Sequence, residues 1–328
     1  MSPRTADHPG SSRPTVEETV QTALIPQVVV AVVGPTASGK TELAVALAEQ
    51  LQGELLSADS RQVFRGCDIG TNKPTPVELR GIPCHLLDLV QPGERFTVAD
   101  YRQAALAAID RVAGHGHLPI FQGGTGLYLR AVFEGWNLAG APPDPQTRAA
   151  LELRLEEQGV EALHAELRQI DPVSADRTQG NPRRIIRALE IHAVTGEPPS
   201  VARRASPPGW RRIILGLEVS LDELDTRIAT RVGRMLEAGW LDEVRTVRAL
   251  FPKADLRLLG HGYPELAEHL DGTRSLEDAR ASIVRQVRQY ARRQLTWFRA
   301  DAQVQWIPPD AGEALSRVRL GMMKKEAS

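Results

Sequence analysis

The run QVVVAVVGPTASGKTELAVALAEQL, residues 27 to 51, constrains the fold of this chain more than any other feature. A β-branched apolar stretch leads into Gly34, and after four residues Gly39, Lys40 and Thr41 precede a segment with helical periodicity. This order of strand, glycine-rich loop and helix is typical of a P-loop, and the alternative is a chance match to a loose pattern. The flanking strand and helix argue against chance. The run therefore predicts an α/β fold that holds a di- or triphosphate.

The residue types in this loop suit phosphate binding. Glycines let successive N–H groups face an anion, and the following helix adds the positive end of its dipole. Lys40 supplies a mobile cation, and the Thr41 hydroxyl is a predicted Mg²⁺ ligand. The predicted diphosphate-binding residues are Gly34, Pro35, Thr36, Ala37, Ser38, Gly39, Lys40 and Thr41.

Composition places the chain among globular proteins. Its 328 residues suffice for one large or two modest domains, with 42% apolar and 25% charged residues. No apolar run reaches membrane-spanning length, which argues against an integral membrane protein. Cys67 and Cys84 lack metal spacing, are too few for a disulfide framework and favour a cytoplasmic location. The net charge of −1 neither supports nor excludes a nucleic-acid partner.

Strands and helices alternate through the first part of the chain, which predicts a parallel sheet. The expected strands are 27–33, 54–60, 84–90 and 118–126, and the expected helices are 40–51 and 96–116. Ligands in such folds lie beyond the carboxyl ends of the strands. Asp59, the turn from Gln122 to Thr125, and the P-loop all follow strands, so we expect them to meet at one cleft.

The pattern changes at about residue 136, where helices occur without strands between them. We predict a P-loop NTPase-like core, its parallel sheet flanked by helices, plus an inserted all-helical domain. Helices are expected at 146–169, 182–195, 221–238, 240–250 and 275–299, and a strand at 211–219. The predicted divisions are a disordered tail at 1–26, core at 27–135, insertion at 136–208, core at 209–310 and a tail at 311–328.

Arginines gather in two stretches of an otherwise neutral chain. The first comprises Arg183, Arg184, Arg187, Arg203, Arg204, Arg211 and Arg212, and the second Arg280, Arg285, Arg288, Arg292, Arg293 and Arg299. A surface for a polyanion and an ordinary solvated helix face both remain open from charge alone.

Four further stretches carry a resemblance to a known family. They are SADSRQVFRGCDIGTNKPT (57 to 75), GGTGLYLRA (123 to 131), NPRRIIRALEIHAVTGEP (181 to 198) and RQLTWFR (293 to 299). Together with GPTASGKT, they closely resemble the tRNA dimethylallyltransferases, also called tRNA isopentenyltransferases, over about residues 28 to 308. The resemblance implies transfer of a dimethylallyl group from its diphosphate to the exocyclic N6 amine of adenosine 37, 3′ of the tRNA anticodon. Pyrophosphate leaves with the help of Mg²⁺, and the enzyme is expected to be a monomer.

The resemblance also implies roles for individual residues. Asp59 becomes the general base, whereas the residues alone allow equally a capping or Mg²⁺-positioning aspartate. Arg231 is placed on the pyrophosphate, with Arg227 as the competing arginine. The catalytic set is therefore Asp59, Lys40, Thr41 and Arg231. The implied tRNA-binding residues are Asp59, Ser60, Arg61, Gln62, Thr125, Arg148, Arg183, Arg184, Ile185, Ile186 and Arg187. For Thr125 a simple turn residue is the alternative.

Some positions depart from the family pattern. Pro264 stands where many members carry a basic or amide residue, which puts a contact near Tyr263 in doubt, and Phe64 replaces a more usual tyrosine. His261 is interpreted as an ordinary loop histidine. Lys73 is interpreted equally as a phosphate ligand or a solvated loop residue.

Two other functions compete with the transferase. A P-loop small-molecule or nucleoside kinase would share Lys40, but the GGTGLY motif and the long insertion argue against it. A nucleotide-driven RNA-binding switch would need an acidic residue after an apolar strand for hydrolysis. Only Asp88, after HLL, is a loose match to that residue.

Overall fold

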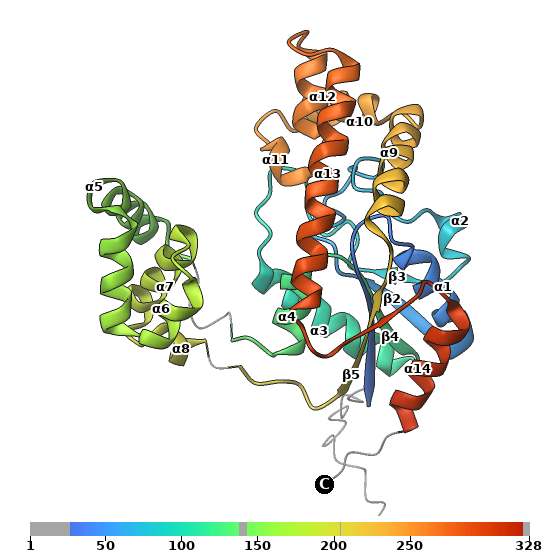
Figure 1. Ribbon diagram of the computed structural model, residues 1–328, viewed down its shortest axis with the longest axis horizontal. Helices are drawn as coiled ribbons and strands as arrows, with labels where there is room; N and C mark the ends of the chain where they lie inside the picture. Colours follow the sequence, from blue (N-terminus) through green and yellow to red (C-terminus); the bar gives the residue numbers. More distant parts are fainter. Residues whose placement is uncertain (1–26, 138–142, 204, 324–328) are drawn as a thin grey trace, which may run out of the picture.

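The computed structural model describes residues 27–137, 143–203 and 205–323 (Figure 1). The tail predicted for residues 1–26 lies outside this part. A six-stranded sheet forms the centre, in the order β3-β2-β4-β1-β5-β6, and every strand pair is parallel. The strands are β1 (Val28–Val33), β2 (Gly53–Ser57), β3 (Cys84–His85), β4 (Leu118–Gly123), β5 (Arg211–Leu217) and β6 (Val304–Ile307). The predicted α/β fold with a parallel sheet is confirmed.

Helices cover both faces of this sheet because the buried strands are apolar on both sides. Val28, Val30 and Val32 of β1 pack toward α1 (Lys40–Leu51) and α14 (Ala311–Met323). The alternate residues of β1 face the opposite layer, formed by α3 (Val98–Gly114) and α4 (Gly126–Phe133); they are Val29, Ala31 and Val33. The short helix α2 (Pro76–Leu79) lies beside α1.

A second apolar cluster is built from helices that follow β5 in the chain. These helices are α9 (Leu221–Glu237), α10 (Trp240–Leu250), α11 (Leu256–Leu259), α12 (Tyr263–Leu270) and α13 (Leu276–Arg299). Their buried side chains include Trp240 and Tyr263, and Phe64 and Cys67 of the loop after β2 join them. This cluster holds that loop in place near the carboxyl ends of the strands.

The remaining helices form a separate lobe (Figure 1). They are α5 (Pro145–Ile170), α6 (Pro172–Thr178), α7 (Pro182–Thr195) and α8 (Pro199–Ala202). Leu163, Leu167 and Ile185 are fully buried in the lobe's own apolar core. The Ser206 N–H donates to Gly135 O at 2.9 Å, so the chain enters and leaves the lobe at adjacent points. These points lie close to the predicted limits of 136 and 208.

The structure corrects several sequence predictions. The tail expected at 311–328 is wrong for Ala311–Met323, which forms α14 and buries Ala314 and Val318 against the sheet. Only Cys84–His85 of the expected strand 84–90 belongs to the sheet, because the loop then turns to make an isolated bridge from Val90 to Phe64. The helix expected at 146–169 is interrupted at Gly159. The sequence also did not reveal α4, α6, α12 and the edge strand β6, which are short elements with few periodic positions.

Candidate active site

The P-loop connects β1 to α1 and places Lys40 at the first position of the helix. Its Nζ donates to Pro35 O at 2.5 Å, so the ammonium group bends back over the loop. Burial lowers the pKa of Lys40 to about 7, and the charge of Arg231 adds to this, while Asp59 opposes it. A bound anion would restore the favourable environment for the lysine cation. The loop is thus a positively charged pocket that favours a polyanion.

Polar atoms beside Lys40 are buried without a partner among the described residues. They are the Ser38 hydroxyl and Gln122 Nε2. The Thr41 hydroxyl, at the second position of α1, donates to Gln122 Oε1 at 3.1 Å. Buried polar groups normally find partners, and unpaired ones indicate a missing ligand, ion or water. Hydroxyl and amide oxygens suit Mg²⁺, and donors suit phosphate, so these residues fit both groups.

Two arginines of α9 reach the P-loop from the other side. Arg231 donates to Thr36 Oγ1 at 3.3 Å, and Arg227 donates to Ala37 O at 3.4 Å. Arg227 is also paired with Glu223 at 2.5 Å. Among the described residues no carboxylate lies within ion-pair distance of Arg231, and burial lowers its pKa. Arg231 is therefore the arginine whose charge is left for a ligand.

Asp59 follows β2 at the same edge of the sheet and is partly buried. The Arg61 N–H donates to its Oδ1 at 2.8 Å and fixes the carboxylate. Burial raises the pKa of Asp59, and the Arg61 hydrogen bond and the charge of Lys40 only partly oppose this. The charge of Lys40 lowers the pKa of Asp59, and the charge of Asp59 raises that of Lys40. The carboxylate therefore lies close to the anion pocket. A carboxylate with a raised pKa is suited to accept a proton.

The turn after β4 joins Asp59's loop to the P-loop. Thr125 Oγ1 accepts from the Ser60 N–H at 3.0 Å, and its own N–H donates to Ala58 O at 3.0 Å. Gly123 permits this contact, since a Cβ there would lie 2.3 Å from Ala58 O. Thr125 is thus a structural link in this turn, and its hydroxyl also lies beside Ser60.

Gln294 of α13 was not singled out from the sequence. Its Oε1 accepts from the Thr36 N–H at 2.8 Å, and its Nε2 donates to Gly124 O at 2.9 Å. One buried side chain therefore holds the P-loop against the turn after β4. The position of Gln294 within RQLTWFR was the available signal.

Arg61 and Gln62, which follow Ser60 in the chain, have environments that differ from that of Ser60. Arg61 donates to Leu258 O, which joins the loop to α11. Gln62 is buried, accepts from the Ser57 hydroxyl at 2.7 Å and donates to Asn72 O at 3.0 Å. The side chain of Gln62 is therefore occupied within the protein, and we assign it to holding the loop.

Comparison with known proteins decides the family. The profile described as IPP transferase matches residues 62–301. This chain belongs to the IPP transferase family. It is 46% identical over 289 residues to a protein of Roseiflexus castenholzii named tRNA dimethylallyltransferase, covering 88% of this chain and 94% of that one. A protein of Geobacillus kaustophilus with the same name is 41% identical over 310 residues, covering 92% and 98%.

Solved structures agree with this membership of the IPP transferase family. The full-length tRNA isopentenylpyrophosphate transferase of Bacillus halodurans is 40% identical, with a TM-score of 0.67, covering 90% of this chain and 96% of that one. A eukaryotic dimethylallyltransferase acting on tRNA is 25% identical, with a TM-score of 0.73, covering 88% and 75%. The resemblance noted in the sequence is confirmed.

In this IPP transferase, Lys73 takes neither of the roles considered from the sequence. It is buried, and its Nζ lies 2.6 Å from Asp68 Oδ1 and 2.5 Å from Asp88 Oδ1. These two ion pairs of Lys73 hold the loop between β2 and β3 in place. Asp88 is thereby occupied, which removes the one loose match to a hydrolytic acidic residue.

The departures at Pro264 and Phe64 have local explanations. Pro264 lies in the first turn of α12, where a missing N–H costs no hydrogen bond. The Tyr263 hydroxyl donates to Glu243 Oε1 at 2.7 Å, and Phe64 is buried in the apolar cluster. His261 shares a hydrogen bond with Gln286 at 3.1 Å, as an ordinary loop histidine would.

The predicted tRNA-binding stretch 183–187 forms the first turns of α7. Arg183 and Arg184 are exposed, whereas Ile185 and Ile186 are buried in the core of the helical lobe. We therefore correct the prediction for the two isoleucines: their side chains position α7 and do not reach its surface.

Arg148 and Arg187 share a buried carboxylate. Both lie 2.7 Å from Glu190 Oε2. Burial opposes ionisation of Glu190, but hydrogen bonds from the two arginines outweigh it and lower its pKa. Glu190 therefore holds Arg148 and Arg187 in fixed positions, and its negative charge balances one of their two positive charges.

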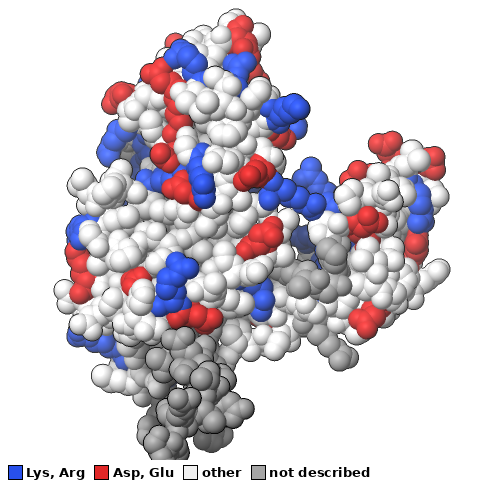
Figure 2. Space-filling view, turned by 180° about the vertical axis from the view of Figure 1, so that it is seen from behind, with Lys and Arg blue, Asp and Glu red and all other residues white. Residues whose placement is uncertain are grey.

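A hollow separates the helical lobe from the core, and basic side chains occur along it (Figure 2). On the core, a pocket of about 600 Å³ lies between α4, β5 and the end of α13 and is lined by Arg130, Arg212, Arg292, Arg293 and Trp297. Arg292 is paired with Asp225 at 3.4 Å, so the second arginine stretch is partly balanced. Arg211 and Arg212 instead anchor α14 and the end of α4 through main-chain oxygens.

Among the described residues, no helix combines the length and apolar character needed to cross a membrane.

Proposed function

We propose that this IPP transferase moves a dimethylallyl group from dimethylallyl diphosphate to the N6 amine of adenosine 37 in tRNA. The observation that carries the proposal is the partly buried Asp59, with a raised pKa, beside a P-loop whose Lys40 and Arg231 are placed to stabilise an anion. Asp59 would accept a proton, and Lys40 and Arg231 would stabilise the leaving diphosphate. This reaction requires both.

The proposed step breaks the allylic C–O bond and forms a C–N bond to N6. The electron pair of the C–O bond leaves on the diphosphate, which the P-loop N–H groups, Lys40 and Arg231 stabilise. The N6 proton passes to the Asp59 carboxylate. Thr41 would hold Mg²⁺, which supplies further neutralisation of the diphosphate.

The adenine must leave the stacked anticodon loop to reach the allylic carbon, at a cost of a few kcal/mol. We propose that Ser60 and Thr125 lie beside the extruded nucleotide and that Arg61 and Gln62 hold this loop in shape. The helical insertion, residues 136–208, would grip the RNA with Arg183 and Arg184. A tRNA substrate also supports a cytoplasmic location, and we propose that the protein acts as a monomer.

The function is tested by offering either dimethylallyl diphosphate or ATP to the protein with undermodified tRNA and Mg²⁺. We expect pyrophosphate release in a one-to-one ratio with prenylated tRNA, and only from the allylic donor. Phosphoryl transfer from ATP without prenylation would instead identify a kinase, and RNA-stimulated ATP hydrolysis would identify a nucleotide-driven switch.

The two arginines of α9 are distinguished by matched substitutions. Arg231→Met is expected to lower kcat/KM for the allylic diphosphate by about 10- to 100-fold, because it removes a charged donor from the leaving group. Arg227→Met should change kcat/KM less than about threefold, since its charge is balanced by Glu223. Steady-state kinetics at saturating tRNA measures both values of kcat/KM. A larger loss in Arg227→Met than in Arg231→Met would assign the diphosphate contact to Arg227 instead.

The exposed arginines of α7 predict that the affinity for tRNA depends on salt concentration. Arg183→Ala combined with Arg184→Ala should weaken tRNA binding and lower the slope of log affinity against log salt by about 0.7–0.9 per lost phosphate contact. Arg168→Ala is the matched control, because this exposed arginine of the same lobe pairs with Asp176. Titration of labelled tRNA at several salt concentrations gives the slopes. Unchanged affinity at every concentration would remove α7 from the interface.

The raised pKa of Asp59 predicts the acid limb of the pH profile. The base must be ionised, so kcat falls as the pH drops through the raised pKa. We therefore expect activity to decline at a pH above the range where an ordinary aspartate titrates. Single-turnover rates with prebound tRNA measure this limb, and a midpoint in the ordinary aspartate range would contradict the assignment.

A further inference from the structure

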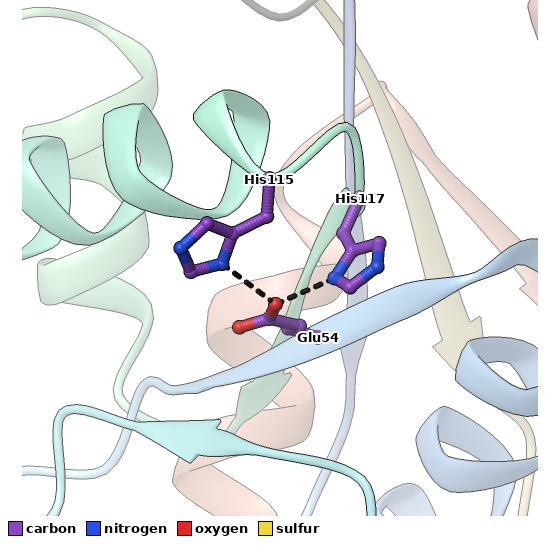
Figure 3. A group of neighbouring side chains, drawn as sticks. All are labelled: Glu54, His115 and His117. Atoms are coloured by element: carbon purple, nitrogen blue, oxygen red, sulfur yellow. Dashed lines mark hydrogen bonds and ion pairs between the residues drawn. The ribbon is translucent and has the colours of Figure 1, made fainter.

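Three histidines surround one buried glutamate at the amino-terminal edge of the sheet, away from the active site. Glu54 is the second residue of β2, and His115 and His117 flank the turn between α3 and β4 (Figure 3). The third histidine, His85, belongs to β3. Asp59 lies beyond the carboxyl end of β2, five residues after Glu54 in the chain, so the cluster and the active site lie at opposite ends of this strand. The mechanism above uses none of the four residues of this cluster.

The ligand atoms of the cluster converge on one carboxylate oxygen. Glu54 Oε1 lies 2.6 Å from His117 Nδ1 and 3.2 Å from His115 Nδ1. The three atoms are all within 4.8 Å of one another. The other oxygen, Oε2, lies 2.5 Å from His85 Nε2, which fixes the plane of the carboxylate. Burial opposes ionisation of Glu54, but its hydrogen bonds to the histidines outweigh it and lower its pKa.

The turn that carries the two outer histidines is held by its own backbone. The His115 N–H donates to Arg111 O at 3.1 Å, and the His117 N–H donates to Val112 O at 3.1 Å. Between them Gly116 has φ of +75°, which reverses the chain so that both rings face Glu54. The His115 and His117 side chains are 56% and 43% exposed, so an ion can reach them from solvent.

We propose that Glu54, His115 and His117 form a zinc-binding site. Two imidazole nitrogens and one carboxylate oxygen are donors that Zn²⁺ prefers, whereas Mg²⁺ prefers oxygen alone. Ligand atoms in a tetrahedral zinc site are about 3.3 Å apart, from bond lengths of about 2.0–2.1 Å. The His115 separation already matches, and the exposed His117 ring must move outward by roughly 0.7 Å. Solvent supplies the fourth ligand.

The remaining histidine has a positioning role in this site. His85 binds the carboxylate oxygen that does not face the ion and so directs Oε1 toward it. Such an outer hydrogen bond typically changes metal affinity by about 10- to 100-fold. The bound ion would connect β2 to the α3–β4 turn and stabilise the folded chain, because zinc would bind the native arrangement and not the unfolded one.

The test uses the full chain with any histidine tag removed, titrated with Zn²⁺ in the presence of excess Mg²⁺. The binding variant is His115→Gln combined with His117→Gln, whose exposed rings leave the fold intact. The matched control is His192→Gln combined with His269→Gln, on α7 and α12. His85→Gln tests the positioning role. Calorimetry gives stoichiometry and affinity, thermal melting gives the shift in Tm, and Co²⁺ absorption reports the ligand geometry.

We expect one Zn²⁺ per chain, a zinc-dependent rise in Tm and a tetrahedral Co²⁺ spectrum in the wild-type and control proteins. The His115/His117 variant should lose at least about 100-fold in affinity, and His85→Gln about 10- to 100-fold. Transfer activity should be unchanged in the His115/His117 variant, which separates this site from the proposed reaction. Equal zinc binding by that variant and the wild type, or no zinc-dependent rise in Tm in the wild type, would overturn the proposal.

Discussion

Replacing Asp59 with asparagine is expected to lower single-turnover prenyl transfer by roughly 10²–10⁴-fold, the usual range for loss of a general base. Asparagine keeps the size of the side chain and can still accept the Arg61 N–H, which lies 2.8 Å from Asp59 Oδ1. It cannot accept the N6 proton at neutral pH. The affinity for tRNA should change little, because the loss lies in chemistry and not in binding.

Asp110→Asn is the matched control for this substitution. Asp110 is exposed on α3, so its replacement should leave the rate at the wild-type value. Rapid-quench measurement with enzyme in excess over tRNA isolates the chemical step from product release. A rate within a factor of a few of wild type in Asp59→Asn would remove Asp59 from the base role and favour the capping role, because asparagine keeps the hydrogen bond from the Arg61 N–H.

Replacing Lys40 with methionine is expected to lower kcat/KM for dimethylallyl diphosphate by about 10²–10³-fold, as for removal of a preorganised donor from a developing anion. Lys40 is partly buried in the P-loop, where burial and the charge of Arg231 lower its pKa to about 7. In the proposed reaction, the bound diphosphate would make the lysine cation favourable there. Methionine replaces the apolar part of the lysine side chain but provides no charge.

Lys253→Met serves as the control for this second experiment, since Lys253 is exposed in the loop between α10 and α11. Steady-state rates at saturating tRNA, with the allylic donor varied, give the ratio for each protein. Binding of tRNA alone should be the same in both variants. A wild-type kcat/KM in Lys40→Met would mean that the P-loop is not the diphosphate site.

The centre of the fold was predictable because its signals are local and strong. The P-loop run predicts β1, α1 and the loop between them, and the apolar strands that follow require a parallel sheet. The convergence of Asp59 with the P-loop followed from the rule that parallel strands place their carboxyl ends together. The helix predicted at 182–195 is α7, which Asn181 caps at its start and Gly196 ends.

The rest depended on contacts distant in sequence. Gln294 joins Thr36, which is 258 positions away, to Gly124, which is 170 positions away, and no local pattern indicates either contact. The burial of Gln62 and the ion pairs of Lys73 likewise appear only once the loop after β2 is packed. Edge strand β6 has four residues and becomes a strand through its pairing with β5. The sequence alone could not distinguish such residues from solvated ones.

The most direct test of the proposed function is mass spectrometry of the nucleosides from undermodified tRNA incubated with the protein, dimethylallyl diphosphate and Mg²⁺. We predict that adenosine 37 gains one dimethylallyl group on N6 and that the Asp59→Asn protein yields only traces of this product in the same time. Adenosine 37 that remains unmodified in the wild-type reaction, or a product carrying phosphate in place of the allyl group, would contradict the account.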